Sequence, residues 1–201
     1  MASLEERLPE EAAEIEAVLM LLMDVFSDYG FRAVSMRRIE ECTGLSKGRL
    51  RQMFPGGKDE MAAEVLEYIE NWFQDEVFDA LQQEKPGEAV VSMLRFLELH
   101  FRAGRRVGLI GSFLLDDDGD RFAIPIRRLF IAWIAALNAA LVRAGVDEAV
   151  AWHMAEDAVA GIQGGMLLSA ALKNEAVFTR ALCRSRTRLE TLVGQIRTRS
   201  H

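Results

Sequence analysis

One window of this chain is strongly basic, although the chain as a whole is acidic. Between residues 32 and 58 only Glu40 and Glu41 are negative, so the window has a local charge of +5 in a chain of net charge −7. A confined basic surface on an acidic body is expected where a protein meets one anionic partner at one place. Its basic residues are Arg32, Arg37, Arg38, Lys47, Arg49, Arg51 and Lys58.

The same window predicts two short helices joined by a tight turn. Ser35 is a suitable N-cap for a helix that Gly44 ends, and Ser46 is a suitable N-cap for a second helix that runs to about Met53. Two adjacent short helices are typical of a helix-turn-helix, whose second helix enters the major groove of duplex DNA by its N-terminal half. The predicted anion is therefore the phosphate backbone of duplex DNA.

The residue types in these helices indicate which contacts each would make. Gly48 lets the backbone come close to DNA, and Arg49 can place two donors on a guanine edge. Arg37 and Arg38 begin the first helix and Lys58 begins the next one along the chain, where backbone N–H groups favour phosphate. The alternative is a solvated basic face on a helical bundle. The predicted DNA-binding set is Arg32, Ser35, Met36, Arg37, Arg38, Ser46, Lys47, Gly48, Arg49, Arg51, Gln52 and Lys58.

The composition favours an all-α protein. Half of the 201 residues are hydrophobic, only four are Pro, and helix-forming residues dominate. A sequence pI near 5.1 argues against a protein that coats nucleic acid non-specifically. The spacing of apolar residues predicts helices at about 9–29, 36–43, 47–53, 59–81, 88–101, 105–115, 121–144, 148–172 and 175–198.

Several features of the sequence favour a cytoplasmic protein. Cys42 and Cys183 stand alone in different contexts, which favours a reducing compartment over a disulfide. Residues 1–16 hold six Glu and one Arg, unlike a signal or transit peptide. The longest apolar stretches, such as Ala132 to Val142, are shorter than the ~20 residues that span a bilayer. We therefore expect no contact with a membrane.

Two stretches of the window resemble a known family. Gly30 to Leu50, followed by Phe54 to Met61, is similar to the DNA-binding head of TetR-family transcriptional repressors, with the motif spacing intact. The Phe-Pro-Gly-Gly-Lys variant at residues 54–58 further resembles the LmrA/YxaF-like subgroup, whose body is weakly echoed at residues 108–111 and 161–171. The chain departs from the family at residues 51–53, where Arg-Gln-Met replaces the usual aromatic phosphate contact.

The resemblance implies an all-helical homodimer whose two heads read an operator palindrome and whose bodies bind a small molecule that releases the DNA. We accordingly expect a helix-turn-helix domain at residues 1–60 and a helical effector-binding and dimerisation domain at residues 61–201, with residues 61–84 as a linking helix. The clearest break in the chain is Lys85-Pro86-Gly87. The operator sequence, the effector and the regulated genes are not predicted.

Large apolar side chains of the body can line a cavity for a hydrophobic or aromatic effector, or simply form the core. Asn138 and Gln163 are polar within apolar runs, so each either orients the effector or makes a hydrogen bond to a neighbouring helix. The predicted effector-binding set is Met93, Phe96, His100, Phe113, Phe130, Trp133, Asn138, Gln163 and Met166.

Three glycines in one helical stretch predict a close helix–helix contact. Each costs ~1 kcal/mol against alanine within a helix, so tight packing must offset the cost. With the apolar stripe of the last helix they indicate a four-helix dimer interface, unless they serve packing within the chain. The predicted interface is Gly161, Gly164, Gly165, Leu168, Leu182, Leu189, Leu192 and Val193.

The sequence offers no enzyme motif. It has no nucleophile elbow, phosphate loop or set of metal ligands, and His153 and Asp157 lack a third ligand at a convincing spacing. We predict no catalytic residue, metal or cofactor. A helical adaptor whose basic patch binds an acidic protein stays open as an alternative, which salt dependence and preference for one duplex sequence would distinguish from operator binding.

Overall fold

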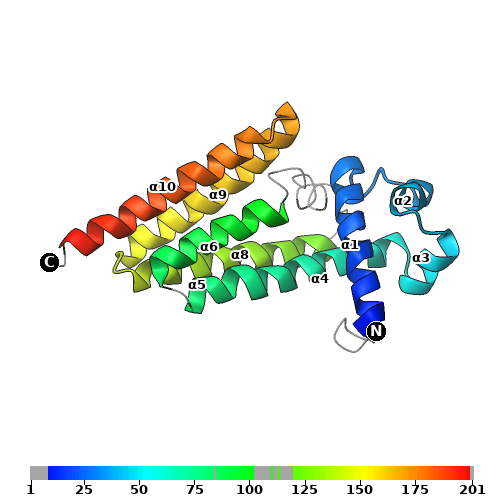
Figure 1. Cartoon of the computed structure of the whole chain (residues 1–201), viewed down its shortest axis with the longest axis horizontal. Helices are drawn as coiled ribbons and strands as arrows, with labels where there is room; N and C mark the ends of the chain where they lie inside the picture. The colour runs from blue at the N-terminus through cyan, green and yellow to red at the C-terminus, as the bar shows by residue number, and fades with distance from the viewer. Residues whose placement is uncertain (1–8, 84, 102–109, 111–112, 114–119, 200–201) are drawn as a thin grey trace. The chain divides into compact units, whose positions relative to one another are not determined.

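The computed structural model describes residues 9–83, 85–101, 110, 113 and 120–199, and every regular element within them is helical (Figure 1). This confirms the predicted all-α fold. The elements are α1 (Pro9–Tyr29), α2 (Met36–Thr43), α3 (Lys47–Met53), α4 (Lys58–Trp72), the π-helical η2 (Phe73–Phe78), α5 (Asp79–Gln83), α6 (Pro86–His100), α8 (Asp120–Arg143), α9 (Glu148–Leu172) and α10 (Ala176–Arg199).

The predicted helices agree with these bounds to within about two residues, with two exceptions. The single helix expected over residues 59–81 is α4, η2 and α5 in succession, because the chain adopts π-helical hydrogen bonding over Phe73–Phe78. The predicted helix at residues 105–115 lies outside the described residues, apart from Ile110 and Phe113. Pro86 stands at the first turn of α6, which explains why that helix begins earlier than expected.

The chain packs as two compact units that divide α4 near its end. Unit 1 comprises residues 1–69 and 108–123, and unit 2 comprises residues 70–107 and 124–201. In unit 1 the apolar faces of α1 and α4 supply the core, which places α2 and α3 beside them. Its fully buried side chains include Ile15, Leu19, Leu22, Phe26, Ile39, Leu50, Phe54, Met61 and Val65.

A cluster of four phenylalanines extends the core of unit 1. The ring of Phe31, in the turn after α1, lies 5.0 Å from the ring of Phe122 and 5.9 Å from that of Phe113. The ring of Phe26 lies 5.6 Å from that of Phe113. These distances are typical of favourable aromatic pairs. The cluster therefore joins Phe113 and the first turn of α8 to the end of α1.

Unit 2 is built around Trp133 of α8. Its ring lies 5.1 Å from the ring of Phe73 in η2, and its Nε1 donates to the sulfur of Met93 in α6 at 3.4 Å. Arg143, at the end of α8, donates to the carbonyl oxygen of Leu81. These contacts hold η2, α5, α6 and α8 together.

The last two helices, α9 and α10, run side by side (Figure 1). A Cβ on Gly165 would stand 2.3 Å from the Cβ of Ala181, so only glycine permits this approach. Asp147 caps α9 by accepting from the N–H groups of Ala149 and Val150, and the side chain of Asn174 accepts from the N–H of Ala176 at the start of α10. Close packing and polar caps thus define a paired module.

The apolar part of α8 is longer than the sequence prediction allowed. By length and composition alone, residues Phe122–Arg143 could cross a membrane. Yet Arg127 and Arg128 interrupt the stretch side by side, and Trp133 and Leu137 are fully buried within unit 2. We interpret α8 as a core helix, because a membrane span rarely carries two adjacent charges in its interior.

Candidate nucleic-acid interface and body sites

Polar caps fix the two short helices that carry the predicted interface. The hydroxyl of Ser35 accepts from the N–H of Arg38, and the hydroxyl of Ser46 accepts from the N–H of Arg49, each at 3.3 Å. Gly44 adopts a φ of 71°, a left-handed conformation that favours glycine, and its N–H donates to the carbonyl of Glu40. The sequence therefore predicts the caps, the turn and both helices correctly.

The turn between α3 and α4 is also held by its own residues. Gly57 has a φ of 70°, and its N–H donates to the carbonyl of Phe54 at 2.9 Å. The carboxylate of Glu60, in the first turn of α4, accepts from the N–H of Gly56. Acidic residues near a helix N-terminus complement its dipole. These contacts set the direction in which α4 leaves the motif.

Lys58 has partners that the sequence did not predict. Its Nζ donates to the carbonyl oxygens of Phe31 at 2.8 Å, Val34 at 3.1 Å and Arg32 at 3.3 Å. The same Nζ lies 4.8 Å from the centre of the Phe31 ring. An ammonium group has three donors, and here all three are used. The predicted phosphate contact of Lys58 stays untested, but in this structure the side chain clamps the turn before α2.

The arginines of α2 are partly neutralised by a neighbour. Arg37 and Arg38 both bind the carboxylate of Glu41, at 3.0 and 2.9 Å. The Arg38 guanidinium also lies 5.2 Å from the centre of the Tyr29 ring. Exposed pairs of this kind contribute little, about 0–1 kcal/mol, and exchange readily for other partners. The two arginines are therefore exposed and positioned at the start of α2, as predicted.

Arg49 is paired with α1. Its Nη2 lies 2.5 Å from Oε2 of Glu14, and its Nε donates to Oε1 of the same carboxylate at 3.3 Å. Its Nη1 faces Oε1 of Gln52 at 3.5 Å. Glu14 and Arg49 are 35 residues apart, so no local pattern in the sequence could have indicated the pair.

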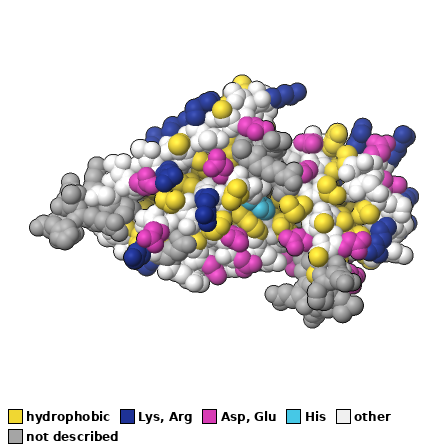
Figure 2. Space-filling model, viewed as in Figure 1, with side chains coloured by type: hydrophobic (Ala, Val, Ile, Leu, Met, Phe, Trp, Pro, Cys, Tyr) yellow, Lys and Arg dark blue, Asp and Glu magenta, His cyan; other side chains and the backbone are white. Residues whose placement is uncertain are grey.

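A basic hollow lies at the start of α4. Lys47 and Arg51 line it together with Met36, the turn at residues 54–57, Lys58 and Met61. Lys47 and Arg51 are exposed, whereas Phe54 and Met61 close its floor as buried residues. Figure 2 shows Lys and Arg side chains interleaved with Asp and Glu over α2 and α3. The structure therefore brings Met36, Lys47 and Arg51 to one place.

Gly48 is not needed for packing within the chain. It is exposed in the first turn of α3, and a Cβ added there would meet only the hydroxyl oxygen of Ser46, at 3.9 Å. Arg32, Arg51 and Gln52 are exposed as well. Since helix propensity and space would both accept alanine at position 48, the glycine has no internal structural reason in this chain.

The predicted effector residues do not form one group. Met93, Trp133 and Met166 are buried in unit 2, and Phe96, His100 and Phe130 are partly exposed there. The ring of His100 stacks on Trp72 at 3.8 Å, a partner that the sequence analysis missed. Phe113 belongs instead to the phenylalanine cluster of unit 1.

Two polar residues of the predicted effector set, Asn138 and Gln163, each bury a side-chain atom that makes no hydrogen bond to any described residue. Among the described residues, Oδ1 of Asn138 and Nε2 of Gln163 are buried without a hydrogen-bond partner. A buried polar atom left unpaired costs about 1–3 kcal/mol. One atom is an acceptor and the other a donor, so a neutral polar group could complement each of them.

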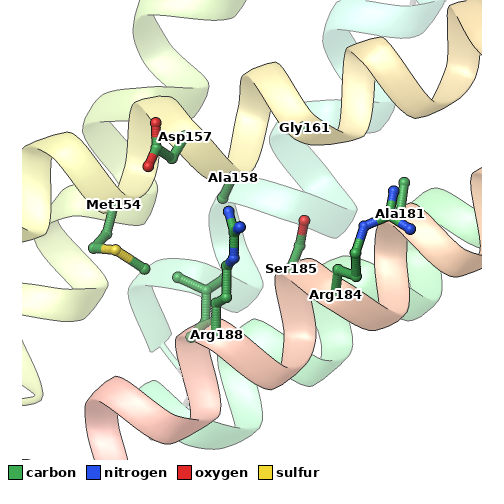
Figure 3. Close-up of a pocket in the computed structure, with 9 residues that line it drawn as sticks. Met154, Asp157, Ala158, Gly161, Ala181, Arg184, Ser185 and Arg188 are labelled. Atoms are coloured by element: carbon green, nitrogen blue, oxygen red, sulfur yellow. The ribbon is translucent and has the colours of Figure 1, made fainter.

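The α9–α10 pair presents a groove that differs from the predicted apolar interface. Met154 and Asp157 of α9 and Arg184, Ser185 and Arg188 of α10 border it, and the Arg188 guanidinium points toward α9 (Figure 3). Arg186, on another face of α10, donates to Glu190 at 2.9 Å. The hydrogen bond and charge of Glu190 raise the pKa of Arg186, so that arginine stays charged and locally paired.

Part of the apolar stripe predicted for the dimer interface is buried within the chain itself. Leu182 and Leu189 are buried within the chain, because this face of α10 packs on α6 and α9. Gly165 serves the same internal packing. Gly161 and Leu168 are exposed, and Gly164 and Leu192 are partly exposed, whereas the side chain of Val193 lies outside the described residues. A direct contact between two copies is therefore compatible with the residues that are exposed or partly exposed. It is not compatible with Leu182, Leu189 and Gly165, which are buried within the chain.

Comparisons with known proteins find similar sequences over most of the chain. Residues 86–182 match the family described as transcriptional regulator LmrA/YxaF-like, C-terminal domain. The chain is similar to the HTH-type transcriptional regulator LmrA of Bacillus subtilis strain 168, with 24% identity over 164 residues that cover 79% of this chain and 87% of that protein. It is also 24% identical to the uncharacterized regulator YxaF of the same organism over 165 residues, covering 80% and 86% of the two chains.

Solved structures share the fold at lower identity. A TetR transcriptional regulator from Legionella pneumophila superposes with a TM-score of 0.71 at 15% identity, covering 95% of this chain and 97% of its own. A TetR-family regulator from Agrobacterium tumefaciens gives a TM-score of 0.70 at 15% identity, covering 89% and 98%. The fold and these matches define a helix-turn-helix transcriptional regulator rather than an enzyme. More narrowly, residues 86–182 match the C-terminal domain of the LmrA/YxaF-like group, and the chain as a whole is similar to TetR-family regulators.

Proposed function

We propose that this regulator is a homodimeric repressor that binds a palindromic operator and releases it when a small hydrophobic or aromatic molecule binds its body. The observation that carries the proposal is the capped α2–α3 pair, which presents exposed basic side chains at the start of both helices. A helix-turn-helix places the first turn of its second helix against base edges. Two copies related by a two-fold axis would read the two halves of a palindrome.

The proposed contacts with DNA come in two kinds. Lys47, Gly48 and Arg49 occupy the first turn of α3, so they face the bases, and the absence of a side chain at Gly48 leaves room for DNA rather than for the protein itself. Arg37, Arg38 and Arg51 hold phosphates from α2 and from the basic hollow at the start of α4. Phosphate contacts position the protein, whereas base contacts specify the sequence. Arg51 thus replaces the missing aromatic contact by charge.

The proposed dimer uses the groove between α9 and α10. The groove carries both signs of charge, with Asp157 on one helix and Arg184 and Arg188 on the other. A two-fold contact is self-complementary when each copy offers both partners. The exposed Leu168 and Leu172 of α9, at 52% and 63% exposure, supply apolar area that a second copy would cover. Arg184→Glu is expected to shift the protein toward monomer, which sedimentation velocity measures, and Asp157→Arg in the partner is expected to restore the mixed dimer.

The proposed effector binds within unit 2. Asn138 Oδ1 would accept and Gln163 Nε2 would donate a hydrogen bond to it, while large apolar side chains such as Trp133 and Phe130 would surround it. An effector of this kind raises the melting temperature, because a ligand that binds only the folded state stabilises it. Screening neutral aromatic compounds by thermal shift against the wild type and Asn138→Leu tests the site. Equal shifts in both proteins would argue against it.

Selection of duplex DNA from a random pool tests the operator proposal. We expect the purified protein to enrich a palindrome, and Lys47→Ala to relax the base preference at symmetric positions, with a cost of about 1–3 kcal/mol in discrimination. Arg51→Ala is expected to weaken binding to all duplex sequences by the same factor and to reduce the dependence of affinity on salt. Arg127→Ala, which removes an exposed arginine from α8, is the control. It should change neither the base preference nor the affinity for DNA. Failure to enrich any sequence at low salt would reject operator binding.

A further inference from the structure

The ion pair between Glu14 and Arg49 joins two parts of the head that have different roles. Glu14 lies in the second turn of α1, and Arg49 lies in the first turn of α3, where the proposed base contacts are made. The carboxylate occupies both the Nε and the Nη2 side of the guanidinium. The side chains of both residues remain exposed, at 42% for Arg49 and 44% for Glu14. The pair is therefore solvent-accessible and open to exchange.

The geometry creates a competition for one cation. An arginine recognises guanine or phosphate through two parallel N–H donors, which is also how it binds a carboxylate. With Glu14 on Nε and Nη2, that pair of donors is already used. A carboxylate near the surface that meets DNA is also repelled by the phosphates, since charges interact over a Debye length of ~10 Å. DNA must separate the pair before it gains the full contact with Arg49.

We propose that Glu14 is an intramolecular competitor of DNA, which neutralises Arg49 until a duplex displaces it. The inference rests on the proposed function, because it assumes that Arg49 contacts DNA. Its consequence is that wild-type affinity is held below what the cations of the head could give. The restraint applies to every duplex, so it limits binding to non-specific DNA, where charge supplies nearly all the affinity.

Removal of the carboxylate charge should therefore tighten binding. Glu14→Gln keeps the shape of the side chain and an amide oxygen near Arg49, but it leaves the guanidinium charge uncompensated. We expect two- to fivefold tighter binding to a non-specific duplex, in line with the modest strength of exposed ion pairs. The slope of log affinity against log salt should become more negative by up to ~0.9, the value for one more neutralised phosphate. A purely structural role of Glu14 would not steepen this slope.

The test is a double-mutant cycle of Glu14→Gln and Arg49→Ala, read by fluorescence anisotropy on one duplex across a salt series. Glu16→Gln is the matched control, because it removes the same charge from α1 while its amide oxygen can still accept from Tyr68, the partner of Glu16 at 3.3 Å. The expected result is a gain for Glu14→Gln that disappears in the Arg49→Ala background and is absent in Glu16→Gln. Melting curves confirm that each variant is folded.

The other outcomes separate this inference from the proposed function. Unchanged or weaker binding of Glu14→Gln would overturn the competition and make Glu14 a support for Arg49. A gain that persists without Arg49, or that Glu16→Gln reproduces, would overturn it in favour of a general charge effect. Unaltered binding of Arg49→Ala would also overturn it while operator binding by other residues stood. A wild-type protein that binds no duplex would remove the proposed function itself.

Discussion

The α2–α3 pair and the α9–α10 pair are both two-helix units, but different forces hold them. The first consists of helices of eight and seven residues with only Ile39, Leu50 and Met53 buried. The second consists of helices of 25 and 24 residues that approach closely at Gly165 and Ala181. Helices shorter than about 12 residues are marginal in water, so a short pair needs caps and clamps, whereas a long pair can rely on packing.

This difference has a functional meaning. Caps and clamps use little apolar surface, so the α2–α3 pair leaves its outer face exposed and polar, and this is the face where we propose contact with DNA. Close packing in the α9–α10 pair consumes the small and apolar residues of the inner face, including Leu182 and Leu189. Its outer face is left with the charged groove. The two pairs can be challenged separately, because their stabilising contacts are of different kinds.

The largest expected effect is the loss of the clamp. Lys58→Met removes three charge-assisted hydrogen bonds and leaves the carbonyls of Phe31, Arg32 and Val34 without this donor, so we expect the free energy of unfolding to fall by about 2–3 kcal/mol. Urea denaturation at fixed protein concentration measures it. Lys85→Met, at an exposed lysine of unit 2, should cost less than about 0.5 kcal/mol. Equal losses in the two variants would contradict a clamp.

The next effect tests close packing. Gly165→Ala should lower the free energy of unfolding by about 1–2 kcal/mol, because the new Cβ overlaps Ala181 even though alanine favours the helix. Ala181→Gly in the same chain should recover part of the loss. Gly164→Ala is the control, since a Cβ there meets no atom within 4 Å, and it should stabilise a single chain. A cost for Gly165→Ala that Ala181→Gly does not change would show that the two residues do not limit the approach.

A smaller effect is expected at the turn of the motif. Gly44 has a φ of 71° and no atom within 4 Å of an added Cβ, so Gly44→Ala introduces backbone strain without a clash. We expect the free energy of unfolding to fall by about 1 kcal/mol, which a lower melting temperature would report. Gly87→Ala also meets open space but lies in the first turn of α6, and it should be neutral or stabilising. Similar melting temperatures for both variants would remove the argument for strain.

The smallest effect on folding is expected at Gly48. Gly48→Ala should leave stability unchanged or raise it by up to ~1 kcal/mol, because the site has room and alanine favours a helix. Affinity for the selected operator should nevertheless fall on the order of tenfold, ~1.4 kcal/mol, since the methyl group holds the backbone away from the bases. Anisotropy titrations measure it. A variant that binds as tightly as the wild type would show that α3 does not approach DNA at this residue.

Local interactions explain how much could be predicted from the sequence. Ser35, Ser46 and Gly44 act on residues within four positions, so their caps and turn were predicted correctly, and so were the nearby helix bounds. The partners of Lys58 and Arg49 lie 24 to 35 residues away, and only the folded head brings them together. The π-helical segment at Phe73–Phe78 has no signal in a helical pattern, because its residues suit an α-helix equally well.

The face of α10 shows a further limit. Apolar residues at helical spacing indicate that a stripe is buried, but the pattern is the same whether a second copy or the chain itself covers it. Leu182 and Leu189 are covered by the chain. Conversely, Asn138 and Gln163 stood out because polar residues within apolar runs must be explained, and their buried unpartnered atoms agree with that reasoning. Their role with an effector stays a prediction.

The clamp of Lys58 also determines how the head can move. One end of the side chain belongs to the first residue of α4, and its ammonium group grips the chain at the entrance to α2. The turn at Gly56 and Gly57 is held by its own hydrogen bonds, and Lys58 adds a second connection between the start of α4 and the entrance to α2. We therefore expect a displacement of the start of α4 to move the entrance to α2 with it.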